Sequence, residues 1–415
     1  MTTVQYARGN SRCGRWTAHI AIAALVTGAF AGAVPVAGTV PASASVSALR
    51  AASAASCPGW TIAGSADPAP GLDALQGVVV LSARNIWAVG DESKSSEGNA
   101  VFRTLIEHWN GRTWTVVHSP NPGIGSDLLS SVTAVSANNI WAAGGYSDKS
   151  DVIATDKTLI LHWNGRSWKK VPSPSPGNSF NDLGTIRRVS ATNIWAVGSD
   201  AGSDFHDRSL ALRWNGKAWK QVPGPNPGKS SDSLSGLAVG SAGAIWTTEF
   251  FTKTNLPTSQ ILRWNGHAWR TAAASPAGSE LFDVSASSSS NAWAVGDDAK
   301  GHSLALHWNG RSWKRISTPN LQPNRLINAL QSVTVVSRTS AWAVGAAHNF
   351  FSVFEGTAIE MHWNGRKWSM MKSPSTKSAN SALFGVQATP TISPWVVGED
   401  GNSIMVQRTL VLRCR

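Results

Sequence analysis

The stretch that decides the fold is 139–168, which reads NIWAAGGYSDKSDVIATDKTLILHWNGRSW. It holds two short apolar motifs, NIWAAG and TLILHW, separated by a polar loop and followed by the turn NGRS. Asn-Gly between apolar runs is a strong hairpin signal, because a two-residue type I′ turn needs positive φ at both central residues. The stretch therefore predicts antiparallel strands joined at Asn164-Gly165.

A two-residue turn also fixes a cross-strand register. It pairs Trp163 with Arg166 and Leu161 with Trp168, with all four side chains on one face. This arrangement permits a cation–π contact between Arg166 and Trp163.

Both motifs recur along the chain. The first has its tryptophan at Trp87, Trp141, Trp195, Trp246, Trp293, Trp342 and Trp395, with spacings of 54, 54, 51, 47, 49 and 53 residues. The second ends at Trp114, Trp168, Trp219, Trp269, Trp313 and Trp368. Of the 21 tryptophans, 20 occupy repeat positions, so their abundance calls for a structural explanation before a functional one.

Each repeat predicts four short strands. In the second repeat these are 130–136, 139–144, 158–163 and 167–174, the last closed by prolines. No stretch after the N-terminal segment shows helical periodicity over three turns. Units of about 50 residues are too long for leucine-rich or helical solenoid repeats and match the blades of a propeller. The sequence predicts an all-β fold, a seven-bladed β-propeller of four-stranded antiparallel blades.

The chain from about 57 to 415 resembles the kelch, WD-repeat and sialidase Asp-box propellers, in a secreted bacterial form. The NGRSW turn is similar to the Asp-box turn, which also joins the third and fourth strands of a blade and ends in an aromatic residue. It departs from that pattern in having Asn where Asp is expected. It departs from kelch because a glycine doublet after the second strand occurs once, at Gly144-Gly145.

The seventh repeat is split between the two ends of the chain. The C-terminal TLVLRCR aligns with TLILHWN, and CPGWTIAG at 57–64 aligns with GRSWKKVP. The terminal strands would therefore pair inside one blade and close the ring. Cys414 takes the place of the turn Trp and Cys57 that of the turn Gly, which predicts a disulfide across the opened hairpin.

The N-terminus reads as a targeting segment. Residues 16–49 contain no Lys, Arg, Asp or Glu, and small residues follow the apolar run. We interpret 1–48 as a signal peptide and cleavage region, 49–56 as a short linker and 57–415 as a single domain. The prediction is a secreted protein, extracellular or associated with the cell wall, with no stable membrane span after cleavage. An uncleaved membrane anchor is the alternative.

Charge gives a weak indication of the partner. The chain carries +12, and removal of Arg8, Arg12 and Arg15 leaves 12 − 3 = +9. No concentrated basic stripe is present, and with export this argues against nucleic-acid binding. A closed ring leaves no free sheet edge that demands a partner, so we expect a monomer.

Acidic residues recur after the second strand of several repeats, in loops of variable length. They are Asp91, Glu92, Asp200, Glu249, Asp297, Asp298, Glu399 and Asp400. At the mouth of a channel they could bind a cation such as calcium, or the hydroxyls of a sugar. The alternative is that they are turn residues that hydrogen-bond local backbone. We predict no required cofactor and leave a metal site open, with calcium as the candidate.

The histidines divide into two groups. His108, His162, His307 and His362 precede the turn Trp in a slot that holds Arg in other repeats. A metal site would not exchange His for Arg, so these are expected to be cross-strand partners. His206 lies in a loop between two aspartates and is the histidine of interest for a site, together with His302.

Several enzyme classes are disfavoured because the residues that they require are missing from the sequence. The chain has no G-x-S-x-G elbow, no H-E-x-x-H helix and no phosphate-binding glycine loop. The leading hypothesis is a non-catalytic module that presents a loop-built face to a glycan or a cell-envelope protein. The alternative is a glycan-active hydrolase or lyase that uses loop carboxylates or Tyr146, since carboxylate separation cannot be taken from a sequence.

Overall fold

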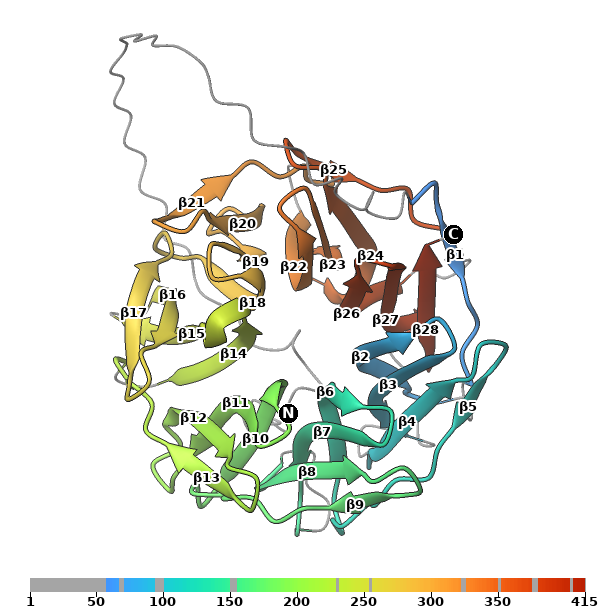
Figure 1. The fold of residues 1–415 in the computed structure, drawn as a ribbon, viewed down its shortest axis with the longest axis vertical. Helices are drawn as coiled ribbons and strands as arrows, with labels where there is room; N and C mark the ends of the chain where they lie inside the picture. The colour runs from blue at the N-terminus through green and yellow to red at the C-terminus, as the bar shows by residue number, and fades with distance from the viewer. Residues whose placement is uncertain are drawn as a thin grey trace, which may run out of the picture.

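In a computed structural model, seven four-stranded antiparallel sheets form a ring around a central channel (Figure 1). The prediction of a seven-bladed β-propeller is confirmed. No helix in the described part of the chain is long and apolar enough to cross a membrane. The described residues are 57–66, 71–93, 101–149, 155–228, 231–253, 256–321, 326–349, 352–374, 380–403 and 406–414. The predicted signal peptide and linker lie outside them.

We number the blades in chain order. Blade 1 comprises β2 (Ala74–Ser82), β3 (Asn85–Glu92), β4 (Arg103–Trp109) and β5 (Trp114–Val116); blade 2 comprises β6 (Asp127–Ser136), β7 (Asn139–Tyr146), β8 (Lys157–Trp163) and β9 (Trp168–Lys170). Blade 3 comprises β10 (Phe180–Ser190), β11 (Asn193–Ala201), β12 (Asp207–Trp214) and β13 (Trp219–Val222); blade 4 comprises β14 (Asp232–Val239), β15 (Ile245–Lys253), β16 (Leu256–Trp264) and β17 (Trp269–Ala274), with the 3-10 turn η2 (Ser241–Gly243).

The remaining blades follow the same order. Blade 5 comprises β18 (Glu280–Ser288), β19 (Asn291–Asp297), β20 (Ser303–Trp308) and β21 (Trp313–Ile316); blade 6 comprises β22 (Leu326–Ser337), β23 (Ser340–Asn349), β24 (Ser352–Trp363) and β25 (Trp368–Met370). Blade 7 comprises β26 (Asn380–Thr389), β27 (Ile392–Ser403), β28 (Val406–Cys414) and β1 (Trp60–Ile62).

The tryptophans form the contacts between blades. The Trp of each NIWAVG motif packs against the turn tryptophans of the next blade, as Trp195 does with Trp264 at 5.0 Å and Trp269 at 5.5 Å between ring centroids. Aromatic rings bury large apolar areas and favour the edge-to-face geometry seen here. The repeated Trp positions are therefore the seams of the ring.

The glycine of the NIWAVG motif allows the first two strands to approach. A Cβ at Gly198 would lie 2.0 Å from the Asp182 carbonyl oxygen, and the corresponding glycines of five other blades are as tightly placed. Blade 4 has Glu249 at this register position, opposite Leu234. There the first strand is displaced around Gly236, whose N–H donates to Thr248 Oγ1 at 2.7 Å.

The turn register differs from the sequence prediction. Trp163 pairs with Trp168, and four residues, Asn164 to Ser167, form the connection. Asn164 Oδ1 accepts hydrogen bonds from the N–H groups of Arg166 and Ser167, at 2.9 and 3.1 Å. This side-chain cap replaces the two-residue turn. The expected pairings of Trp163 with Arg166 and of Leu161 with Trp168 are both wrong, because Trp163 pairs with Trp168 and Leu161 with Lys170. The cation–π contact expected between Trp163 and Arg166 depended on the first of these pairings and is therefore not supported.

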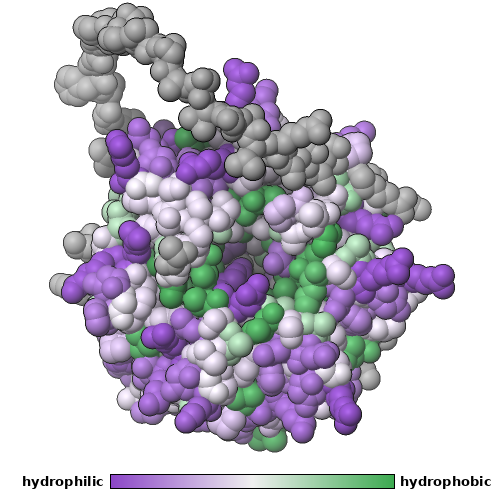
Figure 2. Space-filling view, in the orientation of Figure 1, coloured by the Kyte–Doolittle hydropathy of each residue, from purple (hydrophilic) through white to green (hydrophobic). Residues whose placement is uncertain are grey.

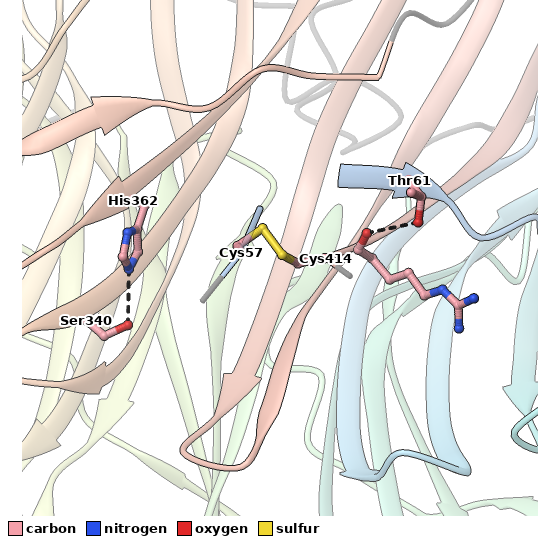
Figure 3. Close-up of a disulfide and its surroundings, with 6 residues drawn as sticks. Cys57, Thr61, Ser340, His362 and Cys414 are labelled. Atoms are coloured by element: carbon pink, nitrogen blue, oxygen red, sulfur yellow. Dashed lines mark hydrogen bonds between the residues drawn. A yellow bond between two sulfur atoms is a disulfide. The ribbon is translucent and has the colours of Figure 1, made fainter. Parts of the chain in front are cut away.

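The ring closes as the split repeat predicted. Strand β1 pairs with β28, with Trp60 opposite Cys414. Cys57 and Cys414 form a disulfide with a Cα–Cα distance of 5.5 Å (Figure 3). Thr61 Oγ1 donates to the Arg413 carbonyl at 3.3 Å in the same blade.

Candidate functional site

The histidines that precede the turn Trp have a structural role. His162 stacks on Trp141 at 4.2 Å between ring centroids, and its Nε2 lies 3.0 Å from Asn139 Oδ1. In blade 3 an arginine does the same, because Arg213 Nε donates to Asn193 Oδ1 at 2.9 Å. His362 takes a serine partner, Ser340 (Figure 3). His and Arg both have flat side chains that can donate a hydrogen bond, which explains why either residue occurs at this position.

Asp91, Glu92, Asp200, Asp297 and Asp298 lie at or directly after the ends of second strands, whereas Glu249, Glu399 and Asp400 lie further inside β15 and β27. We define the loop face as the ends of the second strands (β3, β7, β11, β15, β19, β23 and β27) and the connections that follow them. Antiparallel order places the starts of the third strands on this same face. The carboxylates belong to different blades, however, and Figure 1 shows those blades at separate places around the ring.

One group lies where blade 7 meets blade 1. Asp91, at the end of β3, is 6% exposed. Burial, and then the negative charges of Glu399 and Asp73, hold the pKa of Asp91 well above its ordinary value. Burial also raises the pKa of Glu399 to about 7. Gln407 Nε2 donates to Glu399 Oε1 at 3.3 Å. Asp73, which precedes β2, lies outside the repeated motifs, so no sequence signal marks it.

The remaining predicted acids of these two blades lie beside arginines. Glu92 is opposite Arg103 in the register of β3 and β4. Asp400 is opposite Arg408 in the register of β27 and β28. Both acids are half-buried.

A second group lies on blade 5. Asp297 is opposite Glu280 in the register of β18 and β19. Burial raises the pKa of Glu280 to about 7. Burial, and then the negative charges of Glu280 and Asp298, hold the pKa of Asp297 well above its ordinary value. Asp298 has a different environment: Arg315 Nη2 lies 2.6 Å from its Oδ2. Hydrogen bonds from Arg315 and from the His302 and Lys300 N–H groups outweigh burial and lower its pKa.

A third group lies on blade 3. Asp200 is 6% exposed, and burial raises its pKa to about 6. His206 is exposed in the loop that follows, with its Nδ1 3.7 Å from Asp204 Oδ2. Asp204 also forms an ion pair with Arg208 at 2.5 Å. Between them Phe205 is 78% exposed, with a φ of 55°.

Glu249 is a buried polar centre between blades 3 and 4. Its carboxylate accepts hydrogen bonds from Ser209 Oγ at 2.7 Å and Gln260 Nε2 at 2.5 Å. Burial dominates over these bonds and raises its pKa to about 7. This carboxyl therefore serves the packing of the seam.

The structure brings together some of the predicted residues and separates others. Asp91 and Glu399 interact, whereas Asp297 and Asp200 lie on other blades. Within the described ranges, no group of three or more His, Cys, Asp or Glu side chains is arranged to hold a metal ion. Calcium binding stays a prediction.

The raised carboxyl pKa values predict that stability falls from acid to neutral pH. Several folded-state values lie near 6 to 7, against about 4 in an unfolded chain. These carboxyls therefore bind more protons in the folded state across this window, and they outnumber the partly buried histidines, whose lowered pKa values act in the opposite direction. That stabilisation is fully present below about pH 4 and is lost as pH rises through about 7. We expect a lower free energy of unfolding at pH 8 than at pH 5, measured by urea titration.

A matched variant tests the cause. Glu249→Gln removes one titrating group while keeping a side chain that can hydrogen-bond Ser209. Its stability should depend less on pH than that of the wild type. Equal stability of the wild-type protein at pH 5 and pH 8 would contradict the prediction.

Comparison with known proteins gives structural neighbours only. No family model and no curated protein matches the chain. A solved structure of YCF48 bound to a D1 peptide aligns with a TM-score of 0.51 and 16% identity, covering 86% of this chain and 97% of that one. YCF48 from Cyanidioschyzon merolae aligns with a TM-score of 0.52 and 13% identity, covering 86% and 98%.

A polysaccharide lyase is also similar in structure. This ulvan lyase, bound to its saccharide, aligns with a TM-score of 0.52 and 10% identity, covering 83% of this chain and 94% of that one. At these identities the likeness concerns the fold. The chain is a seven-bladed β-propeller whose structural neighbours include a peptide-bound protein and a glycan-active enzyme.

Proposed function

We propose that this chain is a secreted, non-catalytic binding module that presents its loop face to a glycan or a cell-envelope protein. Export rests on the apolar N-terminal segment, and the Cys57–Cys414 disulfide is consistent with an extracellular protein. The carboxylates of the loop face lie on separate blades, and each interacts with groups of its own or the adjacent blade. That distribution favours a surface for recognition over a single reaction centre.

The observation that carries the proposal is the loop from Gly202 to His206. Phe205 is an aromatic side chain exposed to solvent, on a backbone with positive φ. Non-glycine residues adopt this conformation at a cost, and such residues concentrate at ligand sites. The Asp204–Arg208 ion pair braces the loop. A fixed, exposed aromatic flanked by charges is the type of side chain that dominates binding interfaces.

The structural neighbours are compatible with this proposal. YCF48 binds a peptide in the solved complex, so a propeller of similar fold can bind a peptide. Binding experiments decide whether the partner of this chain is a glycan or a protein.

Phe205→Ala should weaken binding at least tenfold while leaving the thermal midpoint unchanged, because the side chain is exposed. The assay is co-sedimentation of the purified protein with bacterial cell wall and with insoluble polysaccharides, with and without calcium. Val116→Ala is the matched control, since Val116 is an exposed apolar residue of an outer strand. Equal retention of both variants would remove the loop from the proposed surface.

The replacement of Asp297 and Asp298 by Ala tests the acidic part of the loop face. Binding that survives this change without loss would exclude blade 5 from the surface.

A glycan-active enzyme is the second candidate, because of the Glu280–Asp297 pair. Burial raises the pKa of both carboxyls, and the negative charges of Glu280 and Asp298 raise that of Asp297 further; a carboxyl that stays protonated near neutral pH can act as a general acid. Soluble sugar released by the purified protein, and lost in Asp297→Asn, would establish this activity. Retention on the polymer without sugar release would instead support the binding module.

A further inference from the structure

The turns on the side of the ring opposite the loop face form a second surface. We define the turn face as the connections between the first and second strands, and between the third and fourth strands, of each blade. They comprise 83–84, 110–113, 137–138, 164–167, 191–192, 215–218, 240–244, 265–268, 289–290, 309–312, 338–339, 364–367 and 390–391. Because the strands of a blade are antiparallel, both connections lie at the end of the sheet away from the loop face.

Contacts between these turns show that they adjoin one another. A Cβ at Gly111 would lie 2.7 Å from Arg84 Cγ, so the two connections of blade 1 are in contact, and the turn glycines of four other blades lie similarly close to the first connection of their own blade. Between blades 6 and 5, Arg338 Nη2 donates to Ser290 Oγ at 2.7 Å. The turn face is therefore a ring of neighbouring turns at one end of the channel.

The turn face carries positive charge alone. Its residues include no Asp or Glu. Eight Lys or Arg residues, all exposed to solvent, belong to it: Arg84, Arg112, Arg166, Lys217, Arg311, Arg338, Arg366 and Lys367. None of the eight forms an ion pair with a residue that the structure describes. They are scattered over the sequence, and closure of the ring gathers them on one side.

The arrangement of these cations fits a planar partner. They come from five blades, so the charge is spread around the ring. On the face in view, Figure 2 shows hydrophilic side chains toward the periphery and apolar ones around the central hollow. None of the large apolar side chains that are exposed in the described ranges belongs to the turn face. Positive charge distributed around a ring, with no apolar side chain to insert, matches a flat anionic surface better than a linear polyanion, which follows a stripe.

The N-terminal segment joins the ring on this same side. Cys57 is linked to Cys414, which ends the third strand of blade 7. The stretch 16–49, which contains no Lys, Arg, Asp or Glu, precedes Cys57 in the chain. If this stretch enters a membrane, as the sequence predicts for export, it holds the turn face toward the lipid.

We propose that the turn face docks the ring onto a membrane surface of anionic phospholipid. Exposed Lys and Arg side chains are attracted to the phosphate groups of such a surface, and each cation near it strengthens binding by roughly fivefold. In this orientation the loop face points away from the lipid and stays accessible to its own partner. The inference goes beyond the function proposed for the loop face and does not depend on it.

Co-sedimentation of the purified protein with lipid vesicles tests the proposal. We expect retention on vesicles of phosphatidylcholine that contain phosphatidylglycerol, release from them at high salt, and no retention on phosphatidylcholine alone. Equal retention on the two kinds of vesicle would overturn the proposal, because docking by charge requires the anionic lipid. Tighter binding to soluble polyphosphate than to the vesicles, at the same phosphate concentration, would also overturn it and assign the turn face to a linear polymer.

Two pairs of exposed lysines give matched variants. Lys217→Gln/Lys367→Gln removes two charges from the turn face and should weaken binding to the anionic vesicles at least tenfold. Lys149→Gln/Lys300→Gln removes the same charge from the loop face and should leave this binding unchanged, as should Phe205→Ala. An equal loss in the two double variants would show that net charge drives the binding and that the turn face is not the docking surface.

Discussion

Replacement of Cys57 by serine is expected to lower the free energy of unfolding by about 5 to 6 kcal/mol, the loop-closure entropy for a loop of this length. The disulfide links residues 357 positions apart. Such a loss corresponds to a fall of roughly 5 to 10 °C in the thermal midpoint of a domain of this size. Calorimetry under non-reducing conditions measures it.

The strand that the disulfide holds in place is short, so it depends on the covalent link. Strand β1 has three residues, Trp60–Ile62, and pairs with β28 at three positions. Without the covalent link this strand should open before the rest of the ring, so limited proteolysis should cut first near residues 57–66. The double variant Cys57→Ser/Cys414→Ser controls for a reactive free thiol. An unchanged midpoint in both variants would show that strand pairing alone closes the ring.

The second large effect is expected at the seam between blades 3 and 4. Trp195 is fully buried against Trp264 and Trp269, and its truncation to alanine should cost about 3 to 5 kcal/mol because a cavity remains. Urea unfolding followed by circular dichroism measures the change.

Phenylalanine at the same position separates packing from hydrogen bonding. Trp195 Nε1 is buried with no hydrogen-bond partner among the described residues, whereas Trp141 Nε1 donates to Asn139 Oδ1 at 2.7 Å. Removal of an unsatisfied donor is less costly than removal of a satisfied one. Trp195→Phe should therefore destabilise less than Trp141→Phe. The reverse order would show that seam packing differs between the two blades more than their indole hydrogen bonds do.

The repeats made the architecture predictable from the sequence. Each seam needs the same tryptophan contact, so the spacing of Trp87, Trp141 and their equivalents marks every blade. The split repeat likewise placed Cys57 opposite Cys414. The turn register was wrong because Asn-Gly is compatible with several loops, and the side-chain cap from Asn164 selects the longer one.

The environment of the acidic residues could not be predicted from the sequence. Asp91 and Asp297 lie at the ends of second strands, where the motif places them. Nothing in the local sequence indicates that Glu280 lies opposite Asp297. Nor does it indicate that Asp73 and Glu399 lie near Asp91, where blade 7 meets blade 1. The residues that line the central channel come from strands about 50 to 310 residues apart in the sequence. Such neighbours are created by closure of the ring.

The seam contacts have a consequence for how this ring can change in evolution. Because each blade presents the same aromatic surface to its successor, any blade can in principle follow any other, and loss or duplication of an internal unit leaves compatible neighbours. The junction between Trp342 and Trp60 is the exception, since Cys414 stands there in place of the first turn tryptophan. At this junction the two ends of the chain are therefore matched to each other and not to an internal blade.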